Sequence, residues 1–272
     1  MLKTRVVTAV VLLAVLVAIL LSDSLPVVAV AAGVFFAAAA WEALRLFKSR
    51  NAALVAGVWC IAFALIVIQH AYSNARVLML LCVLIWAVRL APSLKLGLPP
   101  IGGFGNKLLS GIYGVAILGC FVAILALFSH SALYLFSVMA IVWIADSGAY
   151  FSGKAFGRHK LAPSISPGKS WEGAIGGWIA VLVIACLSTQ APQLQDTFAA
   201  QLLAHRGWLI LAGVLTVMVA ASVAGDLFES QLKRRAGVKD SSMLLPGHGG
   251  VLDRIDALIP ALPFALLVDA WR

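Results

Sequence analysis

Charged residues are scarce in this sequence, since only 11% of its 272 residues are Asp, Glu, Lys or Arg, against about 25% in ordinary soluble domains. Hydrophobic residues make up 62%. A chain of this composition cannot bury its apolar surface in water, which excludes a large soluble domain. Cysteines are few as well. Each lies in an apolar run without metal-ligand spacing, so we expect small core residues at Cys60, Cys82, Cys120 and Cys186.

Acidic residues are scarcer still, because the chain has 11 of them and a net charge of +9. In a soluble protein this excess would favour nucleic acid as a partner. In membrane proteins, however, Lys and Arg collect in cytoplasmic loops whatever the function. We therefore predict no nucleic-acid partner. Up to about residue 130, Asp23 and Glu42 are the only acids.

Long apolar runs are what the sequence has instead. A helix needs about 20 apolar residues to cross a bilayer. The fold class we predict is all-α, a polytopic integral membrane protein with about nine transmembrane helices. We favour a retained first helix over a cleaved signal peptide, because no clear small-residue cleavage site follows it. The expected spans are 5–22, 25–46, 52–70, 75–91, 111–129, 131–151, 172–190, 207–225 and 250–270.

The orientation follows from the basic residues. If the N-terminus is cytoplasmic, most Lys and Arg residues fall in segments on that side, as the positive-inside rule requires. The polar loops 152–171 and 226–249 then share the cytoplasmic face and can build one site.

Seven of the 11 acids lie in or beside those two loops. Asp226 and Glu229 are three residues apart, which places both on one face of a helix, and Asp253 and Asp256 repeat the spacing. Two such pairs would repel unless a cation lay between them, and carboxylate ligands favour Mg²⁺. An alternative is a buried ion network that only holds helices together, with Lys233, Arg234 and Arg254 as the partners.

Two turns with phosphate-binding chemistry precede predicted helices. Residues 246–250 are rich in glycine, which lets backbone N–H groups approach an anion at a helix start. Residues 164–170 add hydroxyl groups and an ammonium group. We expect His248 to donate a hydrogen bond to phosphate, although a general base or a metal ligand is an alternative. Asp146 either holds the ion, orders Lys169, or pairs with a neighbouring loop base.

These residues carry a family resemblance. The run Ser230–Asp256, SQLKRRAGVKDSSMLLPGHGGVLDRID, resembles the signature of the phosphatidate cytidylyltransferases, also called CDP-diacylglycerol synthases. Residues 146–150 and 166–173 are also similar to segments of that family. The resemblance covers roughly residues 90–272, so we divide the chain into N-terminal membrane helices (1–90) and a catalytic membrane domain (91–272) with its active site on the cytoplasmic face.

The resemblance implies a reaction in which CTP and phosphatidic acid give CDP-diacylglycerol and pyrophosphate with Mg²⁺, a second monovalent or divalent cation being allowed. It also implies a homodimer in the bilayer of the bacterial inner membrane. We assign the ion to Asp226, Asp253 and Asp256, with Glu229 and Asp146 as further ligands, and count Lys233 with the catalytic residues. The residues expected to hold the phosphates are Ser166, Lys169, Lys233, Arg234, Lys239, His248, Gly249, Gly250 and Arg254.

Two other functions compete with this interpretation. A CTP-dependent membrane lipid kinase would share the setting and the nucleotide, but would release CDP in place of pyrophosphate. An ion-coupled transporter would spread its acids through the midplane of the bilayer, whereas these acids cluster at one face.

Overall fold

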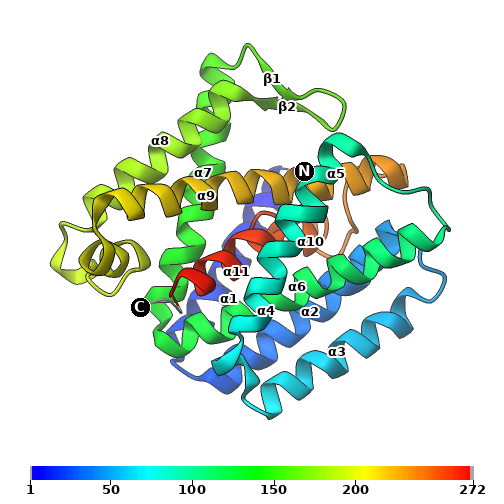
Figure 1. Cartoon of the computed structure of the whole chain (residues 1–272), viewed down its shortest axis with the longest axis horizontal. Coiled ribbons are helices and arrows are strands. Elements are labelled where there is room, and N and C mark those ends of the chain that lie inside the picture. The colour runs from blue at the N-terminus through cyan, green and yellow to red at the C-terminus, as the bar shows by residue number, and fades with distance from the viewer. Residues whose placement is uncertain (1, 270–272) are drawn as a thin grey trace.

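The computed structural model describes residues 2–269, which form a helical bundle with one small hairpin (Figure 1). The N-terminal helices are α1 (Leu2–Leu21), α2 (Leu25–Leu46), α3 (Ala52–Ile68), the 3-10 turn η1 (Ala71–Asn74), α4 (Arg76–Ile85), the π-helix η2 (Trp86–Leu90) and α5 (Ala91–Leu96). The remaining elements are α6 (Phe104–His130), α7 (Ala132–Phe156), β1 (Lys160–Ala162), β2 (Ser166–Ser170), α8 (Trp171–Ser188), η3 (Pro192–Leu194), α9 (Phe198–Ala236), α10 (Leu252–Ile255) and α11 (Leu258–Asp269).

The prediction of an all-α polytopic membrane protein is confirmed. Fewer than nine of the described helices are long enough to span a bilayer. Within the described part of the chain, six helices are long and apolar enough to cross a membrane, and shorter apolar helices accompany them. The six are Leu25–Leu46, Arg76–Leu96, Phe104–His130, Ala132–Phe156, Trp171–Ser188 and Phe198–Ala236. One cysteine prediction is wrong. Cys82 and Cys120 are buried and Cys60 is half-buried, but Cys186 is exposed on α8.

Helix α9 is far longer than the span expected at 207–225. Gly207 has a φ of +78°, which interrupts the helical geometry and separates a short first segment from the long one that follows. The part after Gly207 extends about 43 Å at 1.5 Å per residue, more than the hydrocarbon thickness of about 30 Å. Its C-terminal turns therefore carry Asp226, Glu229 and Lys233 on the same helix.

The span expected at 250–270 is broken, and residue 270 lies outside the described residues. Helix α10 ends at Ile255 and α11 begins at Leu258. Pro260 has no N–H to bond the carbonyl of Asp256, four residues earlier, so one continuous helix is disfavoured. Asp256 consequently lies at a break between two helices.

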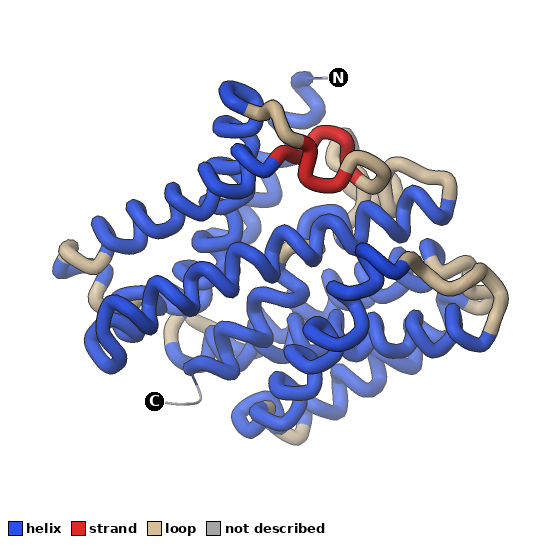
Figure 2. The backbone as a smooth tube through the Cα atoms, turned by 45° about the horizontal axis from the view of Figure 1, so that its top comes forward, coloured by secondary structure: helices blue, strands red, loops and turns tan. Residues whose placement is uncertain are grey.

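The segment 160–170, part of the polar loop expected at 152–171 and containing the turn expected at 164–170, forms an antiparallel hairpin on the outside of the helices (Figure 2). Lys160 pairs with Ser170, and Ala162 with Ser166. The hairpin leads directly into α8, whose first turn is capped because the Ser170 hydroxyl accepts a hydrogen bond from the Gly173 N–H at 3.2 Å.

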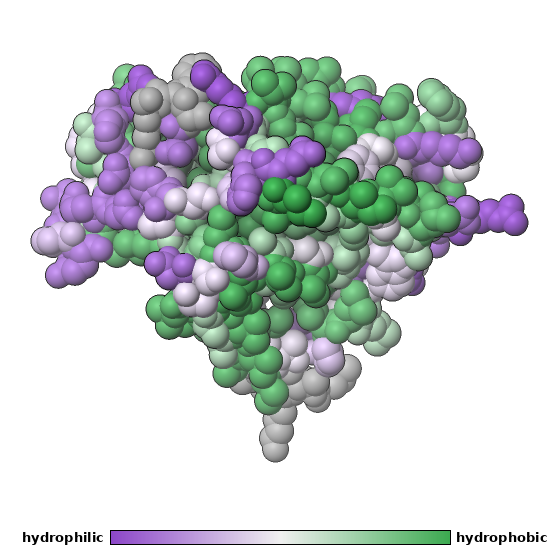
Figure 3. All heavy atoms as spheres, turned by 90° about the horizontal axis from the view of Figure 1, so that it is seen from below, coloured by the Kyte–Doolittle hydropathy of each residue, from purple (hydrophilic) through white to green (hydrophobic). Residues whose placement is uncertain are grey.

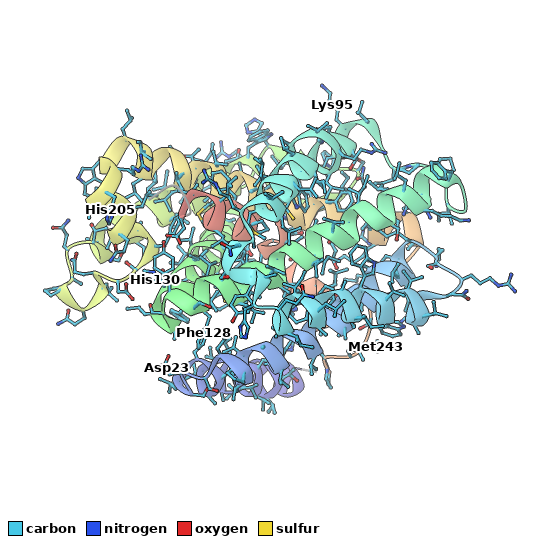
Figure 4. The ribbon with its side chains drawn as sticks, turned by 60° about the horizontal axis from the view of Figure 1, so that its bottom comes forward. Asp23, Lys95, Phe128, His130, His205 and Met243 are labelled. Carbon is cyan, nitrogen blue, oxygen red and sulfur yellow. The ribbon has the colours of Figure 1, made fainter. Side chains whose placement is uncertain are left out.

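Loops and helix ends gather at two opposite ends of the bundle. Lys95 and Met243 lie at one end in Figure 4, while Asp23, His130 and His205 lie at the other. On the face in Figure 3, hydrophobic side chains cover a broad area, and the largest hydrophilic groups lie towards the left and right edges. This distribution is typical of a protein that spans a bilayer.

Helices α7 and α8 pack closely through glycine. A Cβ added to Gly177 would lie 2.4 Å from the Ala145 carbonyl oxygen, and one added to Gly148 would lie 2.9 Å from the Ala180 Cβ. Small residues allow such backbone approach between membrane helices. The contact places Asp146, the neighbour of Ala145, beside the start of α8.

Candidate active site

A cavity of about 680 Å³ opens between α7, the hairpin, α8, the last turns of α9 and α10. Residues from four separate stretches of the chain therefore meet at one place, as the sequence predicted for the two polar loops. The charged and hydroxyl-bearing residues of its wall are Asp146, Tyr150, Lys154, Ser166, Lys169, Ser170, Asp226, Asp253, Arg254 and Asp256.

The two acids of α9 have different partners. Asp226 faces the cavity and pairs with Lys169 of the hairpin, with 2.5 Å between Nζ and Oδ2. Glu229 is fully buried and pairs with Lys233 one turn further along α9, also at 2.5 Å. The spacing of three thus leaves both acids on the side of α9 towards α10 and the hairpin, but only Asp226 reaches the cavity wall.

Lys233 joins α9 to α10. Its ammonium group lies 2.5 Å from the Glu229 carboxylate and 2.5 Å from the Asp253 carboxylate, and its side chain is 13% exposed. Lys233 is absent from the cavity wall. The buried ion network considered from the sequence is therefore present at Lys233. Arg234 and Arg254 take no part in it, because they donate to the carbonyl oxygens of Ile165 and His248.

Asp253 is held by the glycine-rich loop. Its Oδ2 accepts hydrogen bonds from the N–H groups of Ser241 and Gly250, both at 2.8 Å, and from the Ser241 hydroxyl at 2.7 Å. Burial opposes ionisation of this carboxyl, but hydrogen bonds from Lys233 and Gly250 outweigh it, so the pKa of Asp253 lies below its ordinary value. The Gly250 N–H, expected to bind phosphate, is used by Asp253.

Asp256 reaches the site because Gly225 lets α9 approach the break between α10 and α11. A Cβ at Gly225 would lie 2.3 Å from the Asp256 carbonyl oxygen. Burial raises the pKa of the Asp256 side chain to about 7, and the Asp226 carboxylate adds to the rise. Asp226 and Asp256 thus lie near enough in the same cavity wall for the charge of one to affect the other.

Only some of the residues expected to hold phosphate lie in the cavity wall. Ser166, Lys169 and Arg254 line the cavity. Lys233 and five others, which the sequence grouped with them, are not part of its wall. Lys239 and Arg234 are exposed, and the Nδ1 atom of His248 is buried without a hydrogen-bond partner within the described chain. The five are Arg234, Lys239, His248, Gly249 and Gly250.

The donor set fits a hard divalent cation. Carboxylate oxygens are the ligands of Mg²⁺, and Asp146, Asp226 and Asp256 all line the cavity. The Oε1 atom of Glu229 is buried and has no hydrogen-bond partner among residues 2–269. No three Asp, Glu, His or Cys side chains in the described ranges already converge as a metal site, so a cation bound here would need these side chains to turn towards it.

Two functional candidates were missed from the sequence. Lys154 of α7 lines the cavity as a further ammonium group. Glu42 of α2 is fully buried and contacts the loop that holds Asp253. The signal for Glu42 was its place inside an apolar span, where a carboxylate is disfavoured unless it has a specific role.

The fold and site together define a class, a multi-pass membrane protein with a cavity of carboxylates and ammonium groups at one end of the bundle. The chain belongs to the cytidylyltransferase family, whose model matches residues 3–270.

Named relatives agree with that assignment. The phosphatidate cytidylyltransferase of Pseudomonas aeruginosa is 40% identical over 276 residues, 99% of this chain and 98% of the relative. That of Haemophilus influenzae is 54% identical over 138 residues, which span 50% of this chain and 45% of the relative. The enzyme of the same name from Thermotoga maritima is 42% identical over 131 residues, 48% of this chain and 47% of the relative.

The burial of the Lys233 pairs generates a stability prediction. Changing Lys233 to Met leaves two buried carboxylates without their cation, and breaking such a pair costs about 3–5 kcal/mol of stability. We expect a clear fall in the thermal midpoint of the detergent-purified variant. Lys239→Met, at an exposed position, is the control and should leave the midpoint close to wild type. Equal midpoints for the two variants would refute the stabilising role of Lys233.

Proposed function

We propose that this cavity transfers the cytidylyl group of CTP to phosphatidate, giving CDP-diacylglycerol and pyrophosphate. The observation that carries the proposal is a charged cavity beside an apolar groove, with three wall residues in common, in a chain whose relatives are named phosphatidate cytidylyltransferases. A nucleotide triphosphate suits the first compartment and acyl chains suit the second.

The reaction joins two anionic substrates. An oxygen of the lipid phosphate attacks the α-phosphorus of CTP, a new P–O bond forms, the bond from the α-phosphorus to the β-phosphate oxygen breaks, and pyrophosphate leaves. The attacking group belongs to the lipid, so no protein nucleophile is required. The protein's task is positioning and charge neutralisation, as in other phosphoryl transfers.

The charges of the cavity divide into two sets in this proposal. Asp226, Asp253 and Asp256 would hold Mg²⁺, with Glu229 and Asp146 as further ligands, and the ion when bound would neutralise phosphate charge. Lys169 is paired with Asp226 in the structure, so a cation at Asp226 would release its ammonium group towards the triphosphate. Ser166 and Arg254 complete the phosphate contacts from the hairpin and α10.

The lipid tail has a place beside the cavity. An apolar groove of about 370 Å³ lies between α1, α2, α6 and α7. Its wall shares Trp143, Arg254 and Leu258 with the cavity. Arg254 thus stands where a lipid phosphate would meet a nucleotide, and acyl chains need not leave apolar surroundings.

The location we propose is the bacterial inner membrane, with the N-terminus and the cavity on the cytoplasmic side. The support is the relatives' bacterial origin and the concentration of Lys and Arg in the loops at the cavity end. The homodimer stays a prediction, which cross-linking of the protein in native membranes would test.

The proposed reaction has a direct assay. We expect detergent-purified protein to convert CTP labelled on its α-phosphate, together with phosphatidate, into a labelled lipid and unlabelled pyrophosphate. Chelation of Mg²⁺ should abolish the labelling, and added Mg²⁺ should restore it. A labelled CDP product with an unlabelled lipid would instead identify a CTP-dependent lipid kinase and overturn the proposal.

Asp256 gives the sharpest test of the ion ligands. Because the pKa of Asp256 is raised to about 7, an uncharged amide is a close substitute for its protonated form, and Asp256→Asn should fold normally. Turnover should nevertheless fall by about 100-fold or more, because a ligand to the ion is lost.

The matched control for this change is Asp23→Asn, in the turn between α1 and α2 and outside the cavity wall. It should leave turnover unchanged. Near-normal turnover of Asp256→Asn at saturating Mg²⁺ would remove Asp256 from the proposed ion site.

Filling the apolar groove should discriminate against long acyl chains. Ala31 lines the groove on α2, and Ala31→Trp would displace about two methylene groups of a chain, worth about 0.8 kcal/mol each and so about 10-fold in KM. KM for short-chain phosphatidate should change little. Val34→Trp is the control, because Val34 is 66% exposed on the same helix and outside the groove. Equal effects of the two variants on KM would exclude the groove as the acyl site.

A further inference from the structure

Glu42 is the most deeply buried acid of the N-terminal helices and has no role in the reaction as described so far. It lies on α2 with no exposed surface, between the buried Ala39 and Ala43. Burying an ionised carboxylate is strongly unfavourable unless hydrogen bonds or charges compensate it. The groups that surround Glu42 therefore show what holds it there.

Two hydroxyl groups and two backbone N–H groups surround the Glu42 carboxylate, three from the loop before α10 and one from Leu252, the first residue of α10. Oε1 accepts from the Ser242 hydroxyl at 2.5 Å and from the Val251 N–H at 3.1 Å. Oε2 accepts from the Leu252 N–H at 2.6 Å and lies 3.2 Å from the Ser241 hydroxyl. One carboxylate thus binds both ends of the segment 241–252.

The charge of Glu42 is balanced by these dipoles alone within the described side chains, since none of the ion pairs found there includes it. The approach is close. A Cβ on Gly250 would lie 2.5 Å from the Glu42 Oε1 atom and 2.1 Å from the Ser241 Oγ atom. A larger residue at 250 would push the loop away from α2.

The same loop holds Asp253. Ser241 lies within hydrogen-bonding distance of both Glu42 and Asp253, and its N–H also donates to Asp253. Gly250 is packed against Glu42 and donates its N–H to Asp253. Val251 and Leu252, bound by Glu42, lead directly into the helix that carries Asp253.

We propose that Glu42 is a positioning residue for the reaction: it anchors both ends of the loop 241–252 from α2 and so fixes Asp253 in the cavity. This inference rests on the proposed function, because it takes Asp253 as part of the active site. It gives the N-terminal helices a part in catalysis without contact with either substrate.

The chemistry of the contact predicts which substitutions fail. Backbone N–H groups donate to both oxygens, Val251 to Oε1 and Leu252 to Oε2, so both oxygens of residue 42 must accept. Glu42→Gln places an NH₂ group opposite donors, which leaves a buried N–H unsatisfied. Glu42→Asp keeps two acceptor oxygens but is one methylene shorter, so it retains the charge and loses some of the contacts.

The experiment compares the kinetics of the folded, monodisperse fraction of each variant. We expect Glu42→Gln to lower kcat about 10–100-fold and to raise the Mg²⁺ concentration for half-maximal rate, as loss of groups that orient ligands does. Glu42→Asp should recover part of both values. Phe36→Leu, a buried change on the same helix whose ring packs against Phe63 and Phe121, should lower the thermal midpoint but leave kcat and the Mg²⁺ requirement at wild-type values.

If Glu42→Gln fails to fold, Ser242→Ala provides the test, because it removes a single donor to Glu42 and should shift kcat and the Mg²⁺ requirement in the same direction. Wild-type kcat and Mg²⁺ dependence in the folded Glu42 and Ser242 variants would overturn the inference. So would equal kinetic effects of Phe36→Leu. An inactive wild-type protein would instead overturn the proposed function, so the two failures are distinguishable.

Discussion

The site depends on the two ion pairs that the Lys233 ammonium group makes. This group lies between a carboxylate of its own helix, Glu229, and a carboxylate of α10, Asp253. Without Lys233, these two buried carboxylates would repel each other or become protonated. Either response would weaken the contact between α9 and α10. With Lys233 between them, the two helices meet closely enough for Gly225 to contact the Asp256 carbonyl oxygen. The cavity wall is a consequence of that meeting.

A second constraint is that the reaction must bring together a substrate soluble in water and one soluble in lipid. The structure places the two compartments side by side and separates them with Trp143, Arg254 and Leu258. Only one of these three is charged. Arg254 can therefore contact a phosphate from either side, while its own hydrogen bond to the His248 carbonyl oxygen holds its guanidinium at the boundary. The glycine-rich loop serves this geometry by supporting α10, since the N–H of Gly250 binds Asp253.

Much of the fold and part of the site could be predicted from sequence, for identifiable reasons. Apolar length alone gave the helix 25–46, and a spacing of three gave the shared face of Asp226 and Glu229. Which residues form ion pairs could not be predicted. The pairing of Lys169 with Asp226, for example, depends on the register of a hairpin whose residues have the composition of a turn. The break at Asp256 depends on Pro260 and on close packing against Gly225, which is a tertiary contact. The loop 246–250 has the composition of a phosphate-binding loop, but its Gly250 N–H donates to the Asp253 carboxylate of the same chain. Glycine lets any oxygen approach the backbone closely, so its presence alone does not identify the acceptor.

The division of the chain at residue 90 stays a prediction. In the structure, residues on both sides of it contact the loop before α10 and line the apolar groove. The signature segment cannot satisfy its own backbone, because the N–H groups of Val251 and Leu252 lie at the start of a helix of only four residues and need external acceptors. Glu42 supplies both acceptors from α2. The groove depends on the same helices, since α1 and α2 form one wall and the residues around Arg254 form another. A segment confined to residues 91–272 would therefore lack both the anchor of its loop and one side of the apolar groove.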